Sequence, residues 1–437
     1  MKEKNQIIRT LFCFDQDLRL DDNAALEFAA AGASSLLCVY CHDQSRCEDD
    51  SFGTRRLGRL RKRFIEQSIT GLSADLNRRG QRLLQVSGPV TTTIQHLIIE
   101  HRIEQVVRSR HFGCYENLKW KQLMQDNPLI DFIEIDSYTL FTREQIAGIG
   151  ELPETFTKFR KRVELLPIAM PLGTTRLPLS PLSAEPVPAK TGDTEPVADL
   201  FAGGEAAAAL HLEAYFAGRS PSRYKITRNA IDDWSSSSKM SPWLSAGCLS
   251  VRRLYQHLKN YEACNGSNES TYWLYFELLW REYSQWYALY YSERIFLPGG
   301  ISGARPDSAF DDKRFARWCR GETDWPLVNA CMRQLNQTGY ISNRARQIVA
   351  SALINELDLD WRCGAGYFEK QLIDYDVASN WSDWQYIAGV GADPRGGRHF
   401  NIEKQARQFD PDGSFVSRWL NPRSRDLIRA SVETAAG

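Results

Sequence analysis

The sequence has no surplus of charge, no long apolar run and no apparent targeting segment. Its 437 residues include 54 Lys plus Arg and 54 Asp plus Glu. A net charge of zero gives no global argument for nucleic acid, so a nucleic-acid-binding chain of this kind must gather its positive charge on one face. No apolar stretch approaches the ~20 residues that a membrane helix needs. Since the first ten residues also lack the apolar core of a signal peptide, we expect a cytoplasmic protein with no membrane anchor.

The ten cysteines do not predict a disulfide framework. They are scattered through a large chain, which favours free thiols. Cys38, Cys41 and His42 match the spacing of c-type haem attachment, but Leu36–Cys41 is an apolar run typical of a strand. Side chains alternate along a strand, so the two cysteines should point to opposite faces. We therefore favour a structural role for them and predict neither haem nor a metal site.

The first part of the chain alternates apolar runs with helical patterns, which predicts a doubly wound parallel sheet of five strands. Neither G-x-G-x-x-G nor G-x-x-x-x-G-K-[ST] occurs after the first strand, so the common phosphate loops are absent. The expected strands are Ile7–Phe14, Leu36–Cys41, Arg82–Val86, Gln105–Val107 and Asp131–Ile135. The expected helices include Thr54–Arg79, Thr91–Glu100 and Tyr115–Met124.

The second part of the chain has a helical pattern and is rich in tryptophan. We assign residues 1–137 to the α/β domain, 138–209 to a connector with a proline-rich stretch from Pro178 to Pro196, and 210–437 to an all-α domain. Eleven of the twelve tryptophans lie in the last of these. Tyr272–Tyr291 carries aromatic residues on nearly all sides, which predicts a centrally buried helix.

Four polar segments of the helical part could carry chemistry. Glu277 and Arg281 share one face of the Tyr272–Tyr291 helix and could form either a buried ion pair or a ligand site. Ser235–Ser241 places serines before a helix, as an anion site or an ordinary cap would. Asn343 and Arg346 share a helical face, and Asp374, Asp376 and Asn380 lie in a turn-like segment. Each segment alone is a weak signal.

Together and in this order, these segments resemble the photolyase/cryptochrome family. The likeness runs over nearly the whole chain, from Phe12–Asn23 to Phe409–Gly413 and Trp419. Three stretches are similar to its cryptochrome DASH branch: Leu152–Lys161, Phe276–Arg281, and Asn380–Trp384 continuing to Gly389–Arg395.

The resemblance implies an FAD folded into a U within the helical domain. It assigns the pyrophosphate to Tyr224 and to Ser237, Ser238, Lys239, Met240 and Ser241. It places Arg281 near the phosphates or the flavin, Arg346 near the flavin in an ion pair with Asp374, and Asp376 at the flavin's polar edge. It also places Asn380 beside flavin N5, where a neutral amide suits an anionic reduced flavin.

The resemblance further implies light-driven repair of cyclobutane pyrimidine dimers by an electron from reduced flavin. Glu277, Trp280 and Asn343 match the positions that contact the lesion, and the lesion must first leave the base stack. Trp384 and Trp361 match two members of a tryptophan chain that reduces the flavin. The position of its outermost member, near Asp307-Ser308-Ala309, has no tryptophan, and Trp318, Trp325 or a tyrosine are alternatives.

Departures from the family's usual pattern indicate the branch. Tyr386 replaces a second lesion-stacking tryptophan and Gln347 replaces a methionine, which favours lesions in single-stranded DNA. The segment Ile341–Arg344 lacks the histidines that (6-4) photolyases need. In the α/β domain the resemblance implies an antenna, usually 5,10-methenyltetrahydrofolate, with Glu116 as the contact. Asp15-Gln16-Asp17 departs from the usual pattern there.

Three functions remain open. The first is a photolyase that repairs dimers chiefly in single strands; the second is a blue-light photoreceptor with little or no repair, and a flavoprotein that binds nucleic acid without repair is a third option. The residues Glu277, Trp280 and Asn343 favour the enzyme. The expected partner is DNA, and the expected state is a monomer, with a homodimer as the alternative.

Overall fold

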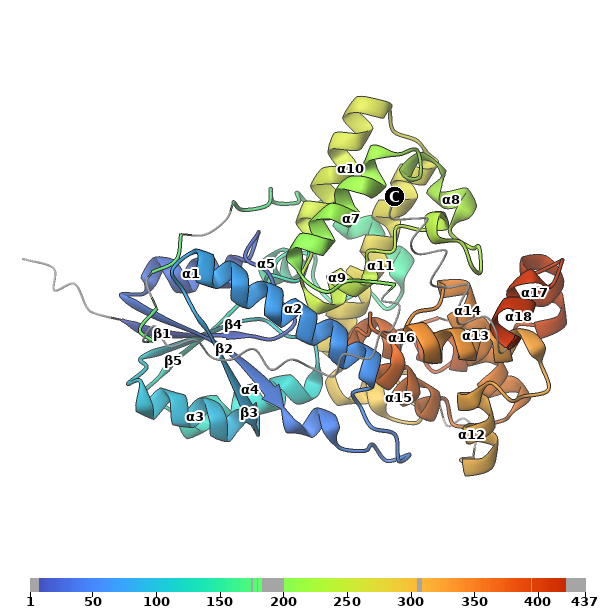
Figure 1. The fold of residues 1–437 in the computed structure, drawn as a ribbon, viewed down its shortest axis with the longest axis horizontal. Coiled ribbons are helices and arrows are strands. Elements are labelled where there is room, and N and C mark those ends of the chain that lie inside the picture. The colour runs from blue at the N-terminus through green and yellow to red at the C-terminus, as the bar shows by residue number, and fades with distance from the viewer. Residues whose placement is uncertain are drawn as a thin grey trace, which may run out of the picture.

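The N-terminal part of the chain is a five-stranded parallel sheet with helices on both faces (Figure 1). The structure, a computed structural model, describes residues 8–173, 176–178, 180–182, 200–304, 309–393 and 395–421. The strands are β1 (Arg9–Phe14), β2 (Ser35–Asp43), β3 (Leu83–Gly88), β4 (Gln105–Ser109) and β5 (Asp131–Ile135). Their order is β3-β2-β1-β4-β5 and every pairing is parallel, so the predicted doubly wound sheet is confirmed.

The two faces of this sheet bury separate cores. Phe12 and Phe14 of β1 pack in one core with helices α1 (Ala24–Gly32) and α2 (Arg59–Arg78). Leu11 packs in the other core with α3 (Val90–Glu100) and α4 (Cys114–Asp126). Because side chains alternate along a strand, neighbours on β1 enter different cores.

The same alternation separates the two cysteines of β2. Cys38 lies in the core with α1 and α2, whereas Cys41 lies on the opposite face beside α3. All ten cysteines are free thiols. The expectation that Cys38 and Cys41 point to opposite faces is confirmed.

The segment after the sheet is more ordered than a plain connector. It contains two short helices, α5 (Arg143–Gly148) and α6 (Phe156–Val163). Helix α7 (Glu205–Ala217) already begins inside the segment expected to be irregular, because its run of alanines strongly favours helix. Most of the proline-rich stretch, residues 183–199, lies outside the described residues.

The C-terminal part is helical, as predicted, and in its described residues no strand follows β5. Its helices are α8 (Tyr224–Thr227), α9 (Ser241–Ala246), α10 (Val251–Asn265), α11 (Glu269–Tyr291), α12 (Asp312–Arg320), α13 (Pro326–Thr338), α14 (Asn343–Ser351), α15 (Trp361–Gln371), α16 (Val377–Ala388), α17 (Ile402–Phe409) and α18 (Ser414–Leu420). No helix in the described ranges has the length and apolar character required to span a membrane.

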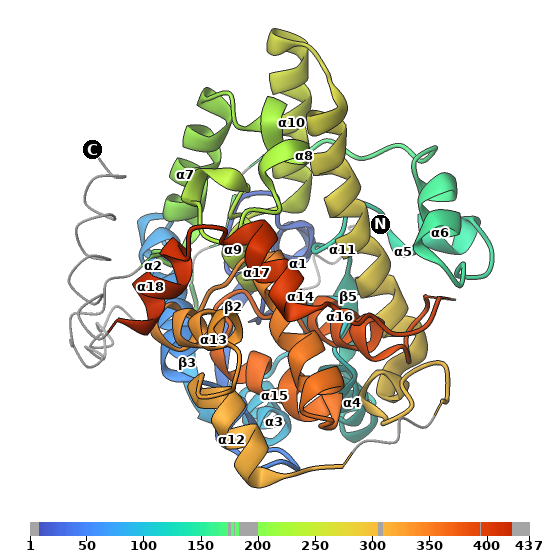
Figure 2. The same ribbon diagram turned by 90° about the vertical axis from the view of Figure 1, so that its right-hand side faces the viewer.

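Helix α11, the longest helix in the described residues, runs through the helical part (Figure 2). It is buried over only part of its length. An Asn268 capping box starts it, and every residue from Glu282 to Ala288 is buried. Tyr272, Trp280 and Tyr290 are exposed instead. The prediction of a centrally buried helix therefore holds for Glu282–Ala288, while the flanking turns are buried on one side and border solvent on the other.

Buried charges join the sheet to the helical part. The fully buried Asp22 carboxylate accepts hydrogen bonds from Arg252 at 2.8 and 3.0 Å and another from Ser250. Glu282 of α11, also fully buried, accepts a hydrogen bond of 2.8 Å from the backbone N–H of Leu140. Burial raises the pKa of Glu282 to about 7, against the effect of the neighbouring Arg281. These contacts fix the sheet, the 138–141 segment and α11 against one another.

Candidate functional site

A pocket of about 540 Å³ opens between α14, α15 and α16 in the helical part. The pocket is lined by Asn343, Arg346, Gln347, Ala350, Phe368, Leu372, Asp374, Tyr375, Asp376, Ser379, Asn380, Asp383, Trp384, Tyr386 and Ile387. Six of the residues predicted from the sequence therefore meet at one place, although they are up to 41 positions apart (343 to 384).

The base of this pocket is an ion pair that connects three distant segments. Arg346 donates to both oxygens of Asp374, at 3.0 and 2.7 Å, and this is the pair that the resemblance implies. The Ser241 hydroxyl donates to the same carboxylate at 2.6 Å. The Asp374 side chain is almost fully buried, so removing its partners would leave an uncompensated charge. The network fixes the Ser237–Ser241 segment to the pocket.

The Ser237–Ser241 segment has an unusual backbone at Lys239. Its φ of 54° lies in the left-handed region, which a residue other than glycine adopts rarely. Burial lowers the pKa of Lys239 to about 8, and its ammonium group donates to Ser237 Oγ at 3.1 Å. The Ser238 carbonyl accepts from His211 at 2.8 Å. Met240 is buried, as is Tyr224 of α8. A buried cation among serines gives this segment the donors that an anion needs.

Helix α16 presents a polar stripe to the pocket. Asp376 caps its N-terminus by accepting from the Ser379 backbone N–H at 2.7 Å. Asn380 is nearly buried and donates to the Ala365 carbonyl at 3.1 Å, which fixes the orientation of its amide. Trp384 follows one turn later and is buried. Spacings of three and four residues put these side chains on one helical face.

Glu277 and Arg281 do not pair with each other, so the ion-pair alternative for these two residues is wrong. Glu277 forms its ion pair with Arg228 and accepts from Trp273 Nε1 at 3.2 Å. Burial raises the pKa of Glu277, and Arg228 opposes that shift. Arg281 turns the other way and donates to the Tyr138 carbonyl at 2.7 Å. Residues at i and i+4 lie on one face of a helix, but they form an ion pair only if neither side chain finds a better partner on another element.

Trp280 lies at the surface, and its indole ring stacks on another aromatic side chain. Its ring stacks on Phe156 of α6 with centroids 3.7 Å apart and planes 14° from parallel. The indole is 38 % exposed, so one face is covered while part of the ring remains free. Helix α6 also carries Lys158, Arg160, Lys161 and Arg162. This neighbourhood therefore combines a fixed aromatic plane with positive charge.

The tryptophans predicted to form a chain are buried but are not all neighbours. Trp384 lies edge-on to Phe368 at 5.1 Å and to Trp318 at 6.3 Å. Trp361 lies edge-on to Trp381 at 5.7 Å instead. Trp318 is fully buried, so it is unsuited to be an outermost, solvent-facing member. Residues 305–308, which hold most of the family's outermost position, lie outside the described residues.

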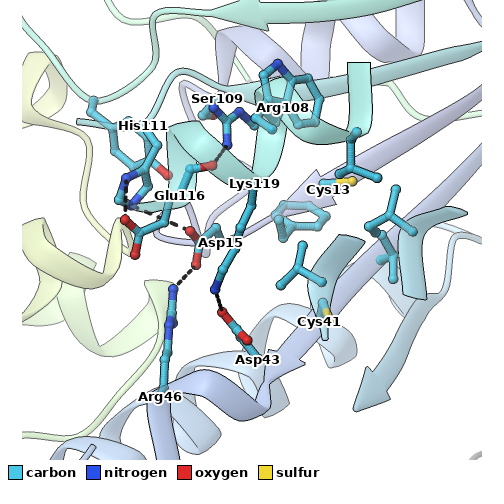
Figure 3. A pocket seen from close by; sticks show the side chains of 17 residues that line it. Cys13, Asp15, Cys41, Asp43, Arg46, Arg108, Ser109, His111, Glu116 and Lys119 are labelled. Carbon is cyan, nitrogen blue, oxygen red and sulfur yellow. Dashed lines mark hydrogen bonds and ion pairs between the residues drawn. The ribbon is translucent and has the colours of Figure 1, made fainter. Parts of the chain in front are cut away.

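A second pocket, of about 710 Å³, lies in the sheet domain at the carboxyl ends of β1, β2 and β4 (Figure 3). Ligands of doubly wound sheets bind at such ends, where the strand order reverses. Here the order reverses between β1 and β4. The pocket is lined by Cys13, Phe14, Asp15, Val39, Cys41, Asp43, Arg46, Val90, Ile94, Arg108, Ser109, His111, Glu116, Lys119, Trp120, Leu123 and Tyr138.

The charges of this sheet pocket are paired. Arg46 donates to Asp15 at 2.8 Å, and Lys119 forms an ion pair with Asp43 (Figure 3). Burial alone would raise the pKa of Asp15, but the charges of Arg46 and His111 lower it to about 2. Arg108 pairs with Glu134 at 2.6 Å. The pairing leaves little net charge for a ligand to neutralise.

Two buried polar atoms of the sheet pocket have no hydrogen-bond partner among the described residues. They are Nε2 of His111 and Nε1 of Trp120, on side chains that are 3 % and 5 % exposed. Such atoms are rare in folded proteins because leaving them unpaired costs about 1–3 kcal/mol. Glu116, the predicted antenna contact, lies 3.8 Å from His111 Nδ1. The pocket is thus equipped to bind a ligand with polar groups.

A smaller cavity of about 250 Å³ lies between the two pockets. His111 and Tyr138 belong to its wall and to the wall of the sheet pocket. Asp376 belongs to its wall and to the wall of the helical pocket. Arg281 and Gln285 also line it, and Gln285 Oε1 is buried without a hydrogen-bond partner in the described part of the chain.

Sequence reasoning missed several residues of these sites. No role was predicted for Phe156 and Asp383, although both lie inside the stretches that carry the resemblance, or for Arg228, which follows Tyr224 by four residues. Asp15 and His111 are brought together only by the folding of the sheet. The one available signal was spacing: Asp383 follows Asn380 by three residues and so shares its helical face.

The comparisons with known proteins agree over the whole chain. The family model for DNA photolyase matches residues 10–178, and that for the FAD binding domain of DNA photolyase matches residues 273–434. A protein named Cryptochrome DASH from Idiomarina loihiensis is 47% identical over 435 residues, covering 97% of this chain and 95% of its own.

Two solved structures have the same fold. The crystal structure of a cryptochrome from Synechocystis sp. has a TM-score of 0.88 at 36% identity, covering 98% of this chain and 91% of the other. A bacterial class III photolyase from Agrobacterium tumefaciens has a TM-score of 0.82 at 27% identity, covering 99% and 91%. Likeness of this extent covers both the sheet and the helical part.

Proposed function

The chain belongs to the photolyase/cryptochrome family, in its cryptochrome DASH branch, and we propose that it uses FAD and blue light to split cyclobutane pyrimidine dimers, chiefly in single-stranded DNA. The observation that carries this proposal is the helical pocket, where the Arg346–Asp374–Ser241 network, Asn380 and Trp384 meet. It lies in the part of the chain that matches the FAD binding domain.

The residues present fit FAD. The cation–carboxylate pair at the base and the Asn380 amide supply hydrogen-bonding groups for the polar edge of a flavin, and Phe368, Leu372 and Trp384 supply apolar walls. The buried Gln285 Oε1 in the adjoining cavity lacks a partner among the described residues, as expected where a ligand contributes one. Ser237–Ser241, with buried Lys239, would hold the pyrophosphate, and Tyr224 is the further contact on that side.

The chemistry depends on the cofactor, and the protein supplies position and environment. Bound in its reduced form, FAD would supply the light-driven electron transfer that splits a dimer. Asn380 places a neutral amide, fixed by the Ala365 carbonyl, where a carboxylate would repel an anion. Arg346 and Asp374 would hold the polar edge of the flavin. Trp384 and, further away, Trp361 supply electrons that keep the cofactor reduced.

The lesion would bind at the mouth of the pocket. Trp280, backed by Phe156, offers a rigid plane for a base, and stacking on an aromatic ring is worth about 1–3 kcal/mol per base. Asn343 and Gln347 offer amides, and Glu277 a carboxyl group. Tyr386 replaces a second stacking indole, which favours a lesion that is already unstacked. The basic residues of α6 beside Trp280 support the DNA backbone as the partner.

We also propose that the sheet pocket holds the antenna, a 5,10-methenyltetrahydrofolate by resemblance to the family. Glu116 lines this pocket near His111, whose Nε2 lies 3.5 Å from Asp15 without a hydrogen bond, and Trp120 Nε1 also lacks a hydrogen-bond partner among the described residues, so a polar ligand there could supply one. We further propose that the protein acts as a monomer in the cytoplasm.

A sensor is the second candidate, because the same pocket would serve a photoreceptor with little repair. One assay separates the two. The reduced holoprotein is illuminated with dimer-containing oligonucleotides, single- and double-stranded, and intact dimers are counted. We expect loss of dimers from the single strand first. If dimers persist in the single strand while the flavin is bound and reduced, the repair function is wrong and the sensor stands.

A further inference from the structure

Asp383 is a carboxyl group in the helical pocket that none of the roles above uses. It lies on α16 between Asn380 and Tyr386, and all three line the pocket. Its side chain is exposed, but the surface it faces is the inside of the pocket. Within the described residues no hydrogen bond or ion pair reaches it, whereas Asp374 and Asp376 in the same wall both accept hydrogen bonds.

The charges that face Asp383 come from three elements. Arg346 of α14 attracts its negative form, while Glu277 of α11 and Asp376 at the start of α16 repel it. Arg346 is already committed to Asp374, and Glu277 has Arg228 as its own cation. Asp383 is therefore the acid of this group without a partner of its own. When several carboxyl groups share a site, the proton goes to the one whose charge is least compensated.

The proton state follows from this arrangement. Although the Asp383 side chain is exposed within the pocket, desolvation by the protein around the pocket raises its pKa to about 7; the charge of Arg346 lowers that pKa, and the charges of Glu277 and Asp376 raise it by less. Below neutral pH the group is a neutral acid with one O–H donor, and above it a carboxylate that only accepts. A strand of DNA brings further negative charge to the pocket mouth and so favours the neutral form.

We propose that Asp383 is a lesion-binding residue whose neutral carboxyl group donates a hydrogen bond to a carbonyl oxygen of the flipped pyrimidine. The proposal rests on the proposed function, since it names a further contact in the same pocket. Asn343 and Gln347 each offer both donor and acceptor atoms, and Glu277, when ionised, can only accept. The acid adds a donor for the carbonyl-rich edge of a thymine. Lesion capture then weakens as the pH rises and Asp383 ionises.

The test measures binding in the dark by the FAD-loaded protein. A labelled single-stranded oligonucleotide with one cyclobutane thymine dimer is titrated at constant salt from about pH 5.5 to 8.5, and the undamaged strand is titrated beside it. The ratio of the two dissociation constants cancels the backbone contribution. We expect this preference for the dimer to fall about tenfold across neutral pH in the wild type, the effect of one lost hydrogen bond and added repulsion.

Three variants sharpen the result. Asp383→Asn keeps a donor that does not ionise, so it should hold the preference high and flat over the whole range. Asp383→Ala should be flat and low. Glu403→Gln, which removes an exposed carboxyl of α17, is the matched control and should follow the wild type. A carboxylic acid band in the infrared spectrum of the holoprotein at pH 6, missing in Asp383→Asn, is a readout that does not depend on DNA.

The outcomes are distinguishable. A flat profile in the wild type, or a sloping one in Asp383→Asn, overturns the role of Asp383 and leaves the repair function intact. Loss of FAD from Asp383→Asn also overturns it, because the residue would then belong to the cofactor. No preference for the dimer at any pH in any variant contradicts the proposed function itself.

Discussion

The sheet pocket and the helical pocket differ in how they hold their charges. In the sheet pocket Asp15 is paired with Arg46 and Asp43 with Lys119. In the helical pocket Asp374 is paired, but Asp383 is not. Paired charges form a fixed environment that changes little near neutral pH. An unpaired acid can change its proton state, so we expect the helical pocket to respond to pH and the sheet pocket to stay constant.

The largest expected effect is the loss of FAD binding when the ion pair at the base of the helical pocket is removed. Arg346→Ala leaves the buried Asp374 without its cation and removes two charge-assisted hydrogen bonds, so FAD affinity should fall by about 100-fold. Flavin absorbance per protein after dialysis measures it. Arg344→Ala, next in sequence but directed toward Phe400 and Phe409, is the control and should retain FAD. Equal loss in both variants would contradict the role of the ion pair.

The next effect separates cofactor binding from cofactor reduction. Trp384→Phe should retain FAD but lose most light-driven flavin reduction with a thiol in solution, because phenylalanine cannot be oxidised under these conditions. The absorbance change during blue illumination measures the rate. Trp243→Phe removes an indole that is equally buried but lies in the other core, and its rate should be unchanged. A normal rate in Trp384→Phe would show that electrons reach the flavin by another route.

A smaller effect should be confined to the sheet pocket. Glu116→Gln removes a charge that lies at the proposed antenna, so antenna affinity should fall by about tenfold while FAD content stays unchanged. The near-ultraviolet absorbance of the purified protein, reconstituted with the folate, is the measurement. Glu100→Gln on the exposed side of α3 is the matched control. If FAD is lost together with the antenna, the two pockets are not independent.

The smallest effect concerns the contact between the two parts of the molecule. Glu282 has a pKa raised by burial to about 7, so the folded state holds a proton that the unfolded state has already released above about pH 5. Stability should therefore fall as the pH rises from 6 to 8, by about 1 kcal/mol. Denaturant unfolding at the two pH values measures it, and Glu282→Gln should remove most of that difference. If the stability of Glu282→Gln fell more steeply with pH than that of the wild type, the raised pKa of Glu282 would be contradicted.

Much of the fold was accessible from the sequence, because local patterns determine it. All five strands begin within two residues of their predicted start, and β5 has the predicted bounds. The apolar period of two is strong in a sheet that is buried on both faces. The start of α7 was missed because glycines and a proline-rich stretch precede its alanines, and the exposure of Trp280 was missed because an aromatic pattern does not show which turns of a helix border solvent.

The site was only partly accessible for a related reason. The Arg346–Asp374 pair and the Asn380–Trp384 face could be named, since a resemblance and short spacings carry them. The partner of Glu277 could not, because Arg228 lies 49 positions away and approaches only when α8 packs against α11. The sheet pocket was also hidden, since its charges come from three strand ends and α4. Contacts between distant segments depend on packing, which no single stretch of sequence specifies.

The small cavity between the pockets has a thermodynamic consequence. His111 and Tyr138 line both this cavity and the sheet pocket, and Asp376 lines both this cavity and the helical pocket. Under the proposed function, His111 would lie next to the antenna, and Arg281 and Asp376 would lie next to FAD. Linkage then requires reciprocity: whatever factor the antenna exerts on FAD affinity, FAD exerts on the affinity for the antenna. Measuring the affinity of the protein for FAD with and without the folate would give this factor and its sign.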